Sequence, residues 1–275
     1  MKNLISVYEE TFEDVKRGYY ENSFGEEIEF PKITKSFYYS KVSKIEKSYK
    51  GSFETKIYAE NVDTFIKAIE LGSDSVVLNM ASFFQPGGGV EKGSKAQEED
   101  LCRRSNLIRS LYSFHFHKAK KLGIRYAGDK FKYPLDKYTA IYSQGISIYR
   151  KPTNYDPYYE PFQTSVISMA AIKSPKLTEE GDLKDSDKNI LREKIRVVLR
   201  VALQNNHTKL VLGAWGCGAY GIPSKSMASL FNEVLLEKDW SGKFEEICFA
   251  IIEDHNSQRN GGNLQSFIDV FGTKN

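Results

Sequence analysis

Short apolar runs and helical repeats alternate along most of the chain. Near-continuous apolar runs lie at residues 75–81, 138–142, 165–169, 209–212 and 247–252. Runs that are apolar on both faces are typical of strands buried inside a sheet. Between them, apolar residues recur at helical spacing, most clearly from Leu191 to Leu203. Strands that alternate with helices predict an α/β fold with a largely parallel sheet covered on both faces.

Two further segments, 97–111 and 226–236, are predicted as helices. The first fifty residues differ from the rest. Residues 5–20 have the spacing of an amphipathic helix, and residues 25–49 alternate lysines with Tyr and Phe. We interpret residues 1–52 as an accessory segment that packs on a core domain formed by residues 53–275.

Composition narrows the class of protein. The chain has 275 residues, 40% hydrophobic and 27% charged, which excludes wholesale disorder. A net charge of +3 is too small to indicate sequence-specific nucleic acid as a partner. No apolar run approaches the ~20 residues of a membrane-spanning helix. Acidic residues come early at the N-terminus, and the three cysteines are widely spaced and odd in number. We therefore expect a soluble, reduced, cytoplasmic protein without a membrane partner.

Two glycine-rich loops follow predicted strands. The first is Pro86-Gly87-Gly88-Gly89-Val90, and the second runs from Gly213 to Gly221. Dense glycine lets the backbone approach a ligand closely, and exposed amides form concavities that bind anions, most often phosphates. Gly216, Gly218 and Gly221 match the spacing of a dinucleotide-binding loop, but the next helix starts only beyond Pro223, so this fingerprint is weak. The two loops together predict a phosphate or diphosphate site.

Paired carboxylates follow the first glycine loop. Gln97-Glu98-Glu99-Asp100 opens a predicted helix, where acidic residues also serve simply to complement the helix dipole. The nearby triple glycine favours a second role, because it places an acid beside bound phosphate and sugar. A negative diphosphate disfavours ionisation of a neighbouring glutamate, which suits that glutamate to general acid catalysis.

These residues carry a resemblance to a known family. Gly87-Gly88-Gly89, seven residues and then Gln97-Glu98-Glu99 resemble the signature of the poly(ADP-ribose) glycohydrolases. The wider stretch from Leu78 to Ser105 is similar to the microbial-type branch, and the similarity continues to the C-terminus. The resemblance implies a macrodomain-like three-layer α/β/α fold with a mixed, largely parallel sheet, here with an N-terminal extension, that binds ADP-ribose across the strand ends.

The resemblance also implies roles for individual residues. Glu99 would be the catalytic acid, and Glu98 would hold ribose hydroxyls and help to position it. Tyr220 would stack on the ribose or adenine, a role that the family often gives to Phe, and Asp63 would take the adenine amino group. The other residues implied to contact substrate or to support the loops are Asn79, Ser82, Gly87, Gly88, Gly89, Val90, Gln97, Gly216, Cys217, Gly218, Ala219 and Gly221.

The implied reaction is hydrolysis of ribose–ribose glycosidic bonds, with release of ADP-ribose from chain ends and without a metal or cofactor. Two alternatives stay open: a hydrolase that removes single ADP-ribose units from protein or nucleic acid, and a non-catalytic macrodomain that binds ADP-ribose. The intact glutamates disfavour the second. Other chemistry-bearing residues have simpler interpretations. These are His115 and His117 without further metal ligands, the turn at Glu253-Asp254-His255, and Arg103 and Arg104 as surface or ion-pair residues.

Overall fold

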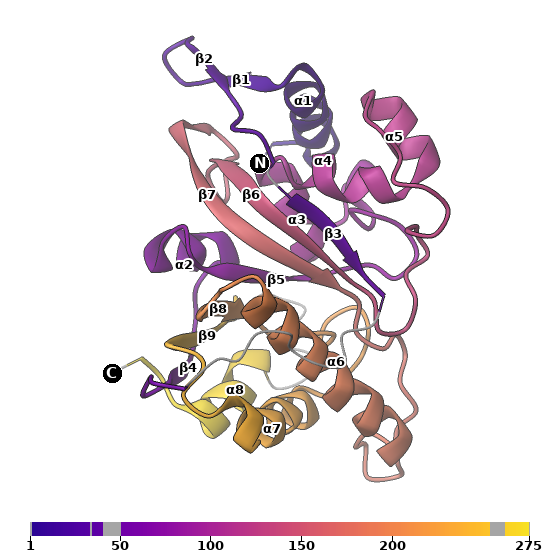
Figure 1. Cartoon of the computed structure of the whole chain (residues 1–275), viewed down its shortest axis with the longest axis vertical. Helices are drawn as coiled ribbons and strands as arrows, with labels where there is room; N and C mark the ends of the chain where they lie inside the picture. The colour runs from indigo at the N-terminus through magenta and orange to yellow at the C-terminus, as the bar shows by residue number, and fades with distance from the viewer. Residues whose placement is uncertain (1, 34, 41–50, 254–261, 275) are drawn as a thin grey trace. The chain divides into compact units, whose positions relative to one another are not determined.

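The computed structural model describes residues 2–33, 35–40, 51–253 and 262–274. The chain divides into two compact units (Figure 1). Unit 1 comprises residues 1–40 and 79–169, and unit 2 comprises residues 41–78 and 170–275. The division falls inside strand β5 (Val76–Met80), which was predicted as the first buried run.

Unit 1 contains an antiparallel sheet with β6 (Ala140–Arg150) between β3 (Lys35–Tyr39) and β7 (Pro157–Met169). β6 and β7 are longer than the apolar runs that predicted them. Their ladder continues past a register shift between Gln144 and Ile146 into polar positions, where Ser147 pairs with Gln163. Hydrogen bonding between the strands extends them, and an apolar pattern cannot indicate that.

A helix that the sequence predicts as continuous over 97–111 is broken. The structure has α3 (Gln97–Arg104) and α4 (Leu107–Leu111), with Ser105 in an extended conformation between them. Asn106 exchanges two hydrogen bonds with Ser147 of β6: its N–H donates to the Ser147 carbonyl, and its Oδ1 accepts from the Ser147 N–H. Ser and Asn readily bind backbone groups in this way, so the contact with β6 replaces the helical bonds.

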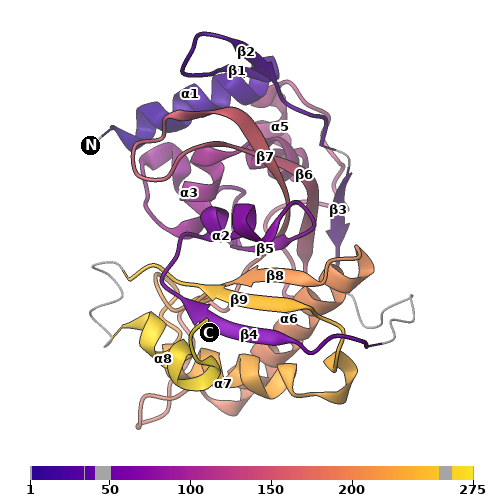
Figure 2. The ribbon, with the colours of Figure 1, turned by 90° about the vertical axis from the view of Figure 1, so that its left-hand side faces the viewer.

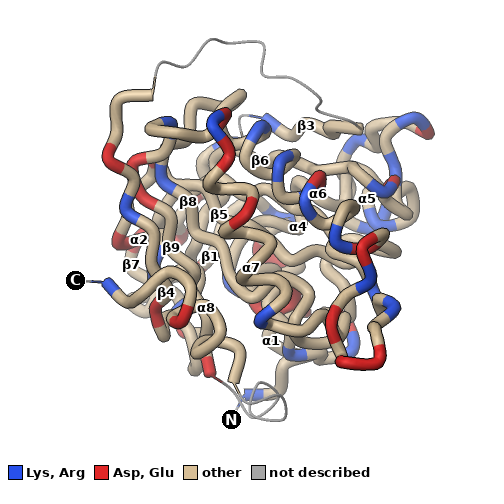
Figure 3. The backbone as a smooth tube through the Cα atoms, turned by 90° about the horizontal axis from the view of Figure 1, so that it is seen from below, with Lys and Arg blue, Asp and Glu red and all other residues tan. Residues whose placement is uncertain are grey.

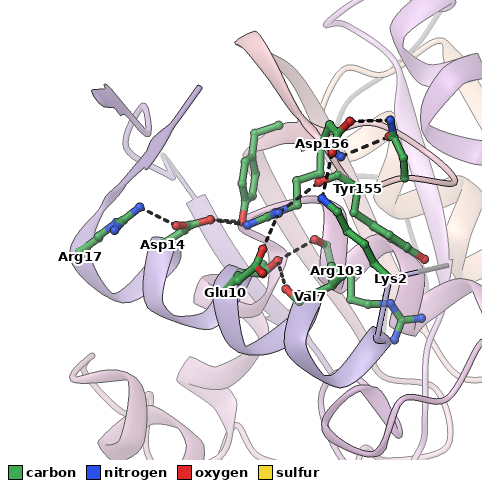
Figure 4. Close-up of polar contacts among 12 residues, drawn as sticks. Lys2, Val7, Glu10, Asp14, Arg17, Arg103, Tyr155 and Asp156 are labelled. Atoms are coloured by element: carbon green, nitrogen blue, oxygen red, sulfur yellow. Dashed lines mark hydrogen bonds and ion pairs between the residues drawn. The ribbon is translucent and has the colours of Figure 1, made fainter. Parts of the chain in front are cut away.

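The predicted N-terminal amphipathic helix is confirmed as α1 (Leu4–Arg17). Its apolar face, which includes Val7, Tyr8 and Val15, is buried. On the polar side, Asp14 accepts hydrogen bonds from the Tyr149 hydroxyl at 2.9 Å and from Arg150 at 2.8 Å (Figure 4). α1 therefore belongs to the same compact unit as residues 79–169, although it lies far from them in the sequence. The division of the chain at residue 52 stays a prediction.

The remaining elements of unit 1 are short. Strands β1 (Tyr19–Glu21) and β2 (Glu27–Glu29) form an antiparallel hairpin after α1. The short 3₁₀ helix η1 (Val90–Lys92) precedes α3, and a second one, η2 (Tyr112–Phe114), follows α4. Helix α5 (Phe116–Leu122) comes next. The predicted alternation of lysines with aromatics over 25–49 falls partly on β3, and its residues 41–49 lie outside the described residues.

Unit 2 contains the parallel strands in the order β5, β8 (Lys209–Leu212), β9 (Glu246–Ala250) and β4 (Lys56–Glu60). Figure 2 shows β8, β9 and β4 side by side. The predicted strands at 209–212 and 247–252 are therefore confirmed. So are the two predicted helices, which are α6 (Asp185–Gln204) and α7 (Ser224–Leu235). The 3₁₀ helix η3 (Lys238–Trp240) follows α7.

Helices cover both faces of this parallel sheet. Successive side chains of a strand point to opposite faces. Lys67 of α2 (Thr64–Leu71) lies over the ring of Tyr58, which pairs with Cys248. The next residue of β9, Phe249, packs against Phe231 of α7 and Phe267 of α8 (Asn263–Phe271). Among the described residues, no helix is long and apolar enough to cross a membrane.

Candidate active site

The first three residues of α3 hold the glycine-rich loop that precedes them. The Gln97 side chain accepts a hydrogen bond from the Met80 amide at 2.8 Å. Glu98 accepts from the amides of Ser82 at 2.6 Å and Gly87 at 3.2 Å. Glu99 accepts from the Gly89 amide at 2.7 Å. The chain from β5 to the triple glycine is therefore tied to three consecutive side chains at the start of one helix.

Glu98 is buried and fully hydrogen bonded. Besides its two amides, it accepts from Asn79 Nδ2 at 3.4 Å, and Asn79 also donates to Ser168 Oγ of β7 at 2.9 Å. The pKa of Glu98 is raised to about 8, chiefly because burial disfavours the charged form and with a smaller contribution from the Glu99 charge, while the hydrogen-bond donors act in the opposite direction. The structure therefore makes Glu98 a linking group between β5, β7 and the loop.

Glu99 differs from its neighbour in the number of its partners. Its Oε1 accepts from Gly89, whereas its Oε2 is buried and has no hydrogen-bond partner among the described residues. A buried oxygen without a partner is costly to a folded protein and is expected where a ligand or water completes the site. One oxygen therefore orients this carboxyl group, and the other is open to an added partner.

The glycines are required because the carboxylates approach the backbone closely. Gly88 has φ +53°, and a Cβ built there would lie 2.3 Å from Glu99 Oε1 and 3.1 Å from Glu98 Oε2. A Cβ at Gly89 would lie 2.3 Å from Ser94 Oγ. The amides of residues 87–90 all have acceptors in the protein, Gly88 on Gln85 and Val90 on Gly87 among them. Contacts of this loop with ribose or diphosphate stay a prediction.

Buried side chains support this loop from behind. Arg103, 1% exposed, donates to the Ser94 carbonyl at 2.7 Å, and Lys118 donates to the Pro86 carbonyl at 3.4 Å. The Tyr112 hydroxyl lies beside Gly87 and hydrogen bonds to Tyr8 of α1 at 2.6 Å. Hydrophobic periodicity does not indicate these supports, because each depends on a contact between distant parts of the chain.

The interpretation of the two arginines after the signature needs correction. Arg103 and Arg104 are both buried, so neither lies at the surface. Arg104 does form the ion pair that was considered, with Asp100 at 2.8 Å. Arg103 instead lies near the ring of Tyr155, with its Nε and Nη1 lacking hydrogen-bond partners among the described residues.

The second glycine-rich loop, residues 213–221, belongs to unit 2. Its turns are closed by backbone bonds such as Ile222 N–H to Gly216 O. No described residue accepts from the amides of Gly216, Gly218 or Ala219, and Gly218 and Ala219 are exposed. Cys217 is buried, and burial raises the pKa of its thiol, so the structure gives it no nucleophilic character. The free amides of this loop are suited to an anion.

Other predicted residues have structural partners that the sequence did not show. Asp63 caps α2, accepting from the amides of Phe65 and Ile66. Glu253 accepts from the Leu264 amide at the start of α8, and Asp254 and His255 lie outside the described residues. The His115 side chain caps α5. Of the described residues, no group of three or more His, Cys, Asp or Glu is arranged to hold a metal ion.

The structure thus brings together Asn79, Ser82, the triple glycine with Val90, and Gln97 to Glu99 within unit 1. Asp63, Tyr220 and the rest of the second loop belong to unit 2, where Tyr220 is half-buried and its carbonyl accepts from Ser174. The roles of all these residues toward a ligand stay predictions.

The mixed α/β fold, with a glycine-rich loop held on two buried glutamates, is that of the macrodomain-like proteins. The family model described as microbial-type PARG, catalytic domain, where PARG is poly(ADP-ribose) glycohydrolase, matches residues 8–151. The chain belongs to this family, and the recognition of the family and of its fold from sequence is confirmed. The predicted class of enzyme, a glycosidase, is confirmed with it.

Solved structures agree with this assignment. The chain is 25% identical to poly(ADP-ribose) glycohydrolase from Thermomonospora curvata, with a TM-score of 0.78 over 98% of this chain and 99% of that chain. It is 32% identical to the enzyme from Deinococcus radiodurans in complex with ADP-ribose, with a TM-score of 0.63 over 80% of this chain and 85% of that chain. No curated protein sequence matches the chain significantly.

Proposed function

We propose that this protein hydrolyses the ribose–ribose O-glycosidic bonds of poly(ADP-ribose) and releases ADP-ribose from chain ends, with Glu99 as the general acid and base. The polymer is free or attached to modified proteins, and the setting is the cytoplasm. Family membership and the likeness to a structure solved with ADP-ribose support the substrate. The observation that carries the assignment of the acid is the difference between Glu98 and Glu99.

Glu98 is bonded at both oxygens, so it has no free position from which to transfer a proton. Glu99 is oriented through Oε1 by the Gly89 amide and keeps Oε2 unpartnered. Oε2 is thus the atom that would protonate the departing ribose oxygen. Positive charge then develops at the anomeric carbon, and the nearby diphosphate oxygens stabilise it. Water attacks this carbon, and Glu99 accepts its proton.

The second glycine loop supports the binding half of the proposal. The unpaired amides of Gly216, Gly218 and Ala219 are suited to the diphosphate. Tyr220 would stack on ribose or adenine. Asp63 would accept a hydrogen bond from the adenine amino group in addition to its two capping bonds. Asn79 and Ser82 would act mainly through Glu98, because both are hydrogen bonded to it.

The test compares wild type with Glu99→Gln on poly(ADP-ribose) and on a mono-ADP-ribosylated protein, scored by released ADP-ribose. Glutamine keeps an oxygen for the Gly89 amide but has no proton to give. We expect ADP-ribose affinity to be retained and kcat to fall by at least ~10²–10⁴-fold. The matched control is Glu9→Gln, which changes an exposed glutamate on α1 and leaves activity intact.

Two outcomes would contradict the proposal in different ways. Release from the mono-modified protein alone would make the protein a mono-ADP-ribosyl hydrolase. Binding of ADP-ribose without release from either substrate would make it a non-catalytic ADP-ribose-binding macrodomain. Full activity of Glu99→Gln would assign the acid to another residue.

A further inference from the structure

Positive charge is concentrated in one stretch of unit 1, which we call the basic segment (residues 116–137). It contains seven Lys and Arg against two Asp, a net of five positive charges (seven minus two), whereas the whole chain has a net charge of +3. Figure 3 shows blue Lys and Arg positions gathered along and next to α5. The balance of charge over the whole chain therefore conceals a strongly basic local surface.

Part of this charge is not neutralised within the protein. Lys118 and Lys121 both lie near Glu91, and Lys132 lies near Asp129. The exposed side chains of Lys120, Arg125 and Lys130 have no ion-pair partner among the described residues. Three unpaired cations on one exposed segment form an electrostatic footprint for an anionic partner.

Exposed aromatic rings accompany these cations. Phe116 and Phe131 are 54% and 43% exposed, and Phe84, in the loop that leads to the triple glycine, is 57% exposed. Each exposed ring offers a face on which a planar base can stack. Cationic side chains interleaved with exposed rings are the arrangement that binds single-stranded polynucleotides, because phosphates contact the cations and bases stack on the rings.

The basic segment is joined to the catalytic loop at two places. At one end, Lys118 Nζ donates to the Pro86 carbonyl at 3.4 Å. At the other end, the Leu135 amide donates to the Phe83 carbonyl at 2.9 Å. These two contacts fix the basic segment against the chain that leads to the triple glycine, and that chain also carries the exposed ring of Phe84.

We propose that the basic segment, with Phe84, binds the part of the poly(ADP-ribose) chain that lies beyond the unit being cleaved. This inference rests on the proposed function. Each unit of the polymer carries a diphosphate for the cations and an adenine for the rings. The surface makes the protein more effective on long polymer than on short fragments, and the preference weakens as salt rises. A nucleic acid has similar groups, but the connection to the catalytic loop favours the substrate polymer.

The test neutralises the three unpaired cations together as Lys120→Gln, Arg125→Gln and Lys130→Gln. The matched control neutralises three exposed lysines elsewhere, Lys32→Gln, Lys56→Gln and Lys238→Gln. Affinity for polymer of about twenty units and for ADP-ribose is measured on both triple variants in the Glu99→Gln background, where hydrolysis does not interfere. Thermal unfolding of each variant verifies that it is folded.

We expect the basic-segment variant to bind the long polymer at least tenfold more weakly in 50 mM salt and to bind ADP-ribose as before. The variant lacks three phosphate contacts, so its affinity depends less on salt. Raising salt from 50 to 200 mM should therefore weaken polymer binding by the parent protein about 20-fold more than polymer binding by the variant. In the catalytically active background, kcat/KM should fall for long polymer and stay unchanged for a two-unit substrate.

The proposal is overturned if the control variant loses as much affinity for the long polymer as the basic-segment variant, or if the basic-segment variant loses none. Hydrolysis of the two-unit substrate would still uphold the proposed function in either case. Single-stranded DNA of equal charge that displaces the polymer completely would make nucleic acid the partner and would also overturn it. If wild type hydrolyses neither substrate, the proposed function fails, and the binding measurements decide the surface by themselves.

Discussion

The two loops are both rich in glycine, but they differ in how many of their amides have acceptors within the protein. In the first loop, the amides of residues 87–90 all have acceptors, and the amides of Gly87 and Gly89 donate to Glu98 and Glu99. In the second, the amides of Gly216, Gly218 and Ala219 have none among the described residues. Glycine is needed in the first loop because carboxylates occupy the space of a side chain, and it leaves donors open in the second.

This difference separates two functions that glycine density alone does not distinguish. The first loop fixes the position of the Glu99 carboxyl group, the proposed general acid, so its alteration should reduce turnover. The second loop offers donors to an anion, so its alteration should reduce affinity. The four predictions below, ordered from the largest expected effect to the smallest, sharpen this separation or break it.

Gly88→Ala should have the largest effect. The new methyl group would lie 2.3 Å from Glu99 Oε1, and φ +53° is strained for alanine by about 1–2 kcal/mol. Displacement of the carboxyl group should lower kcat by ~10²–10⁴-fold with ADP-ribose affinity largely kept. The control is Gly18→Ala, which has φ +93° but open space, so it should reduce stability without reducing turnover. Equal kcat in both variants would contradict this role of the first loop.

Glu98 should make stability depend on pH. Its folded pKa of about 8 lies above an unfolded value of about 4.3, so the folded state binds more protons between these values. The free energy of unfolding therefore falls as pH rises from about 4 to 8, by up to about 1.4 kcal/mol per pH unit. In denaturant titrations at several pH values, Glu98→Gln should lose this slope and Glu9→Gln should keep it. A slope shared by Glu98→Gln would assign the effect to other groups.

Gly216→Ala should weaken binding about tenfold, or ~1.4 kcal/mol. Its Cβ would lie 2.6 Å from Ile222 Cδ1 and 2.9 Å from Ala171 Cβ, and φ is +77°. The loop must shift, which disturbs the arrangement of its free amides. Gly218→Ala meets no atom within 4 Å and should bind ADP-ribose like wild type in calorimetry. Unchanged affinity of Gly216→Ala would remove this loop from the binding site.

Tyr8→Phe should have the smallest effect, because it removes a single hydroxyl behind the first loop, which hydrogen bonds to Tyr112 at 2.6 Å and to Glu91 at 3.4 Å. Loss of such a bond reduces stability by about 0.5–1.5 kcal/mol, measurable by urea unfolding. Tyr159→Phe, at a side chain that is 55% exposed, serves as the control and should be neutral. Identical unfolding curves for the two variants would mean that α1 does not stabilise the catalytic loop through this contact.

Much of this molecule was predictable because the signals are local. Buried parallel strands such as β5 and β8 leave uninterrupted apolar runs, and α6 and α7 leave helical periodicity. The spacing from Gly87 to Glu99 also survives as a linear pattern, because a short loop joins the glycines to the helix they contact. The assignment of Glu99 and Glu98 to different roles was available from the family resemblance and stays a prediction for this chain.

The sequence by itself determined the α/β class, the family and the group of residues around Glu98 and Glu99. Tertiary structure alone decided the break of the helix at Ser105, the burial of Arg103, and which glycine amides have acceptors. The physical reason is the same in each case. A polar group takes the partner that the fold brings within about 3 Å, and that partner comes from a distant or differently structured segment on which local hydrophobic periodicity carries no information.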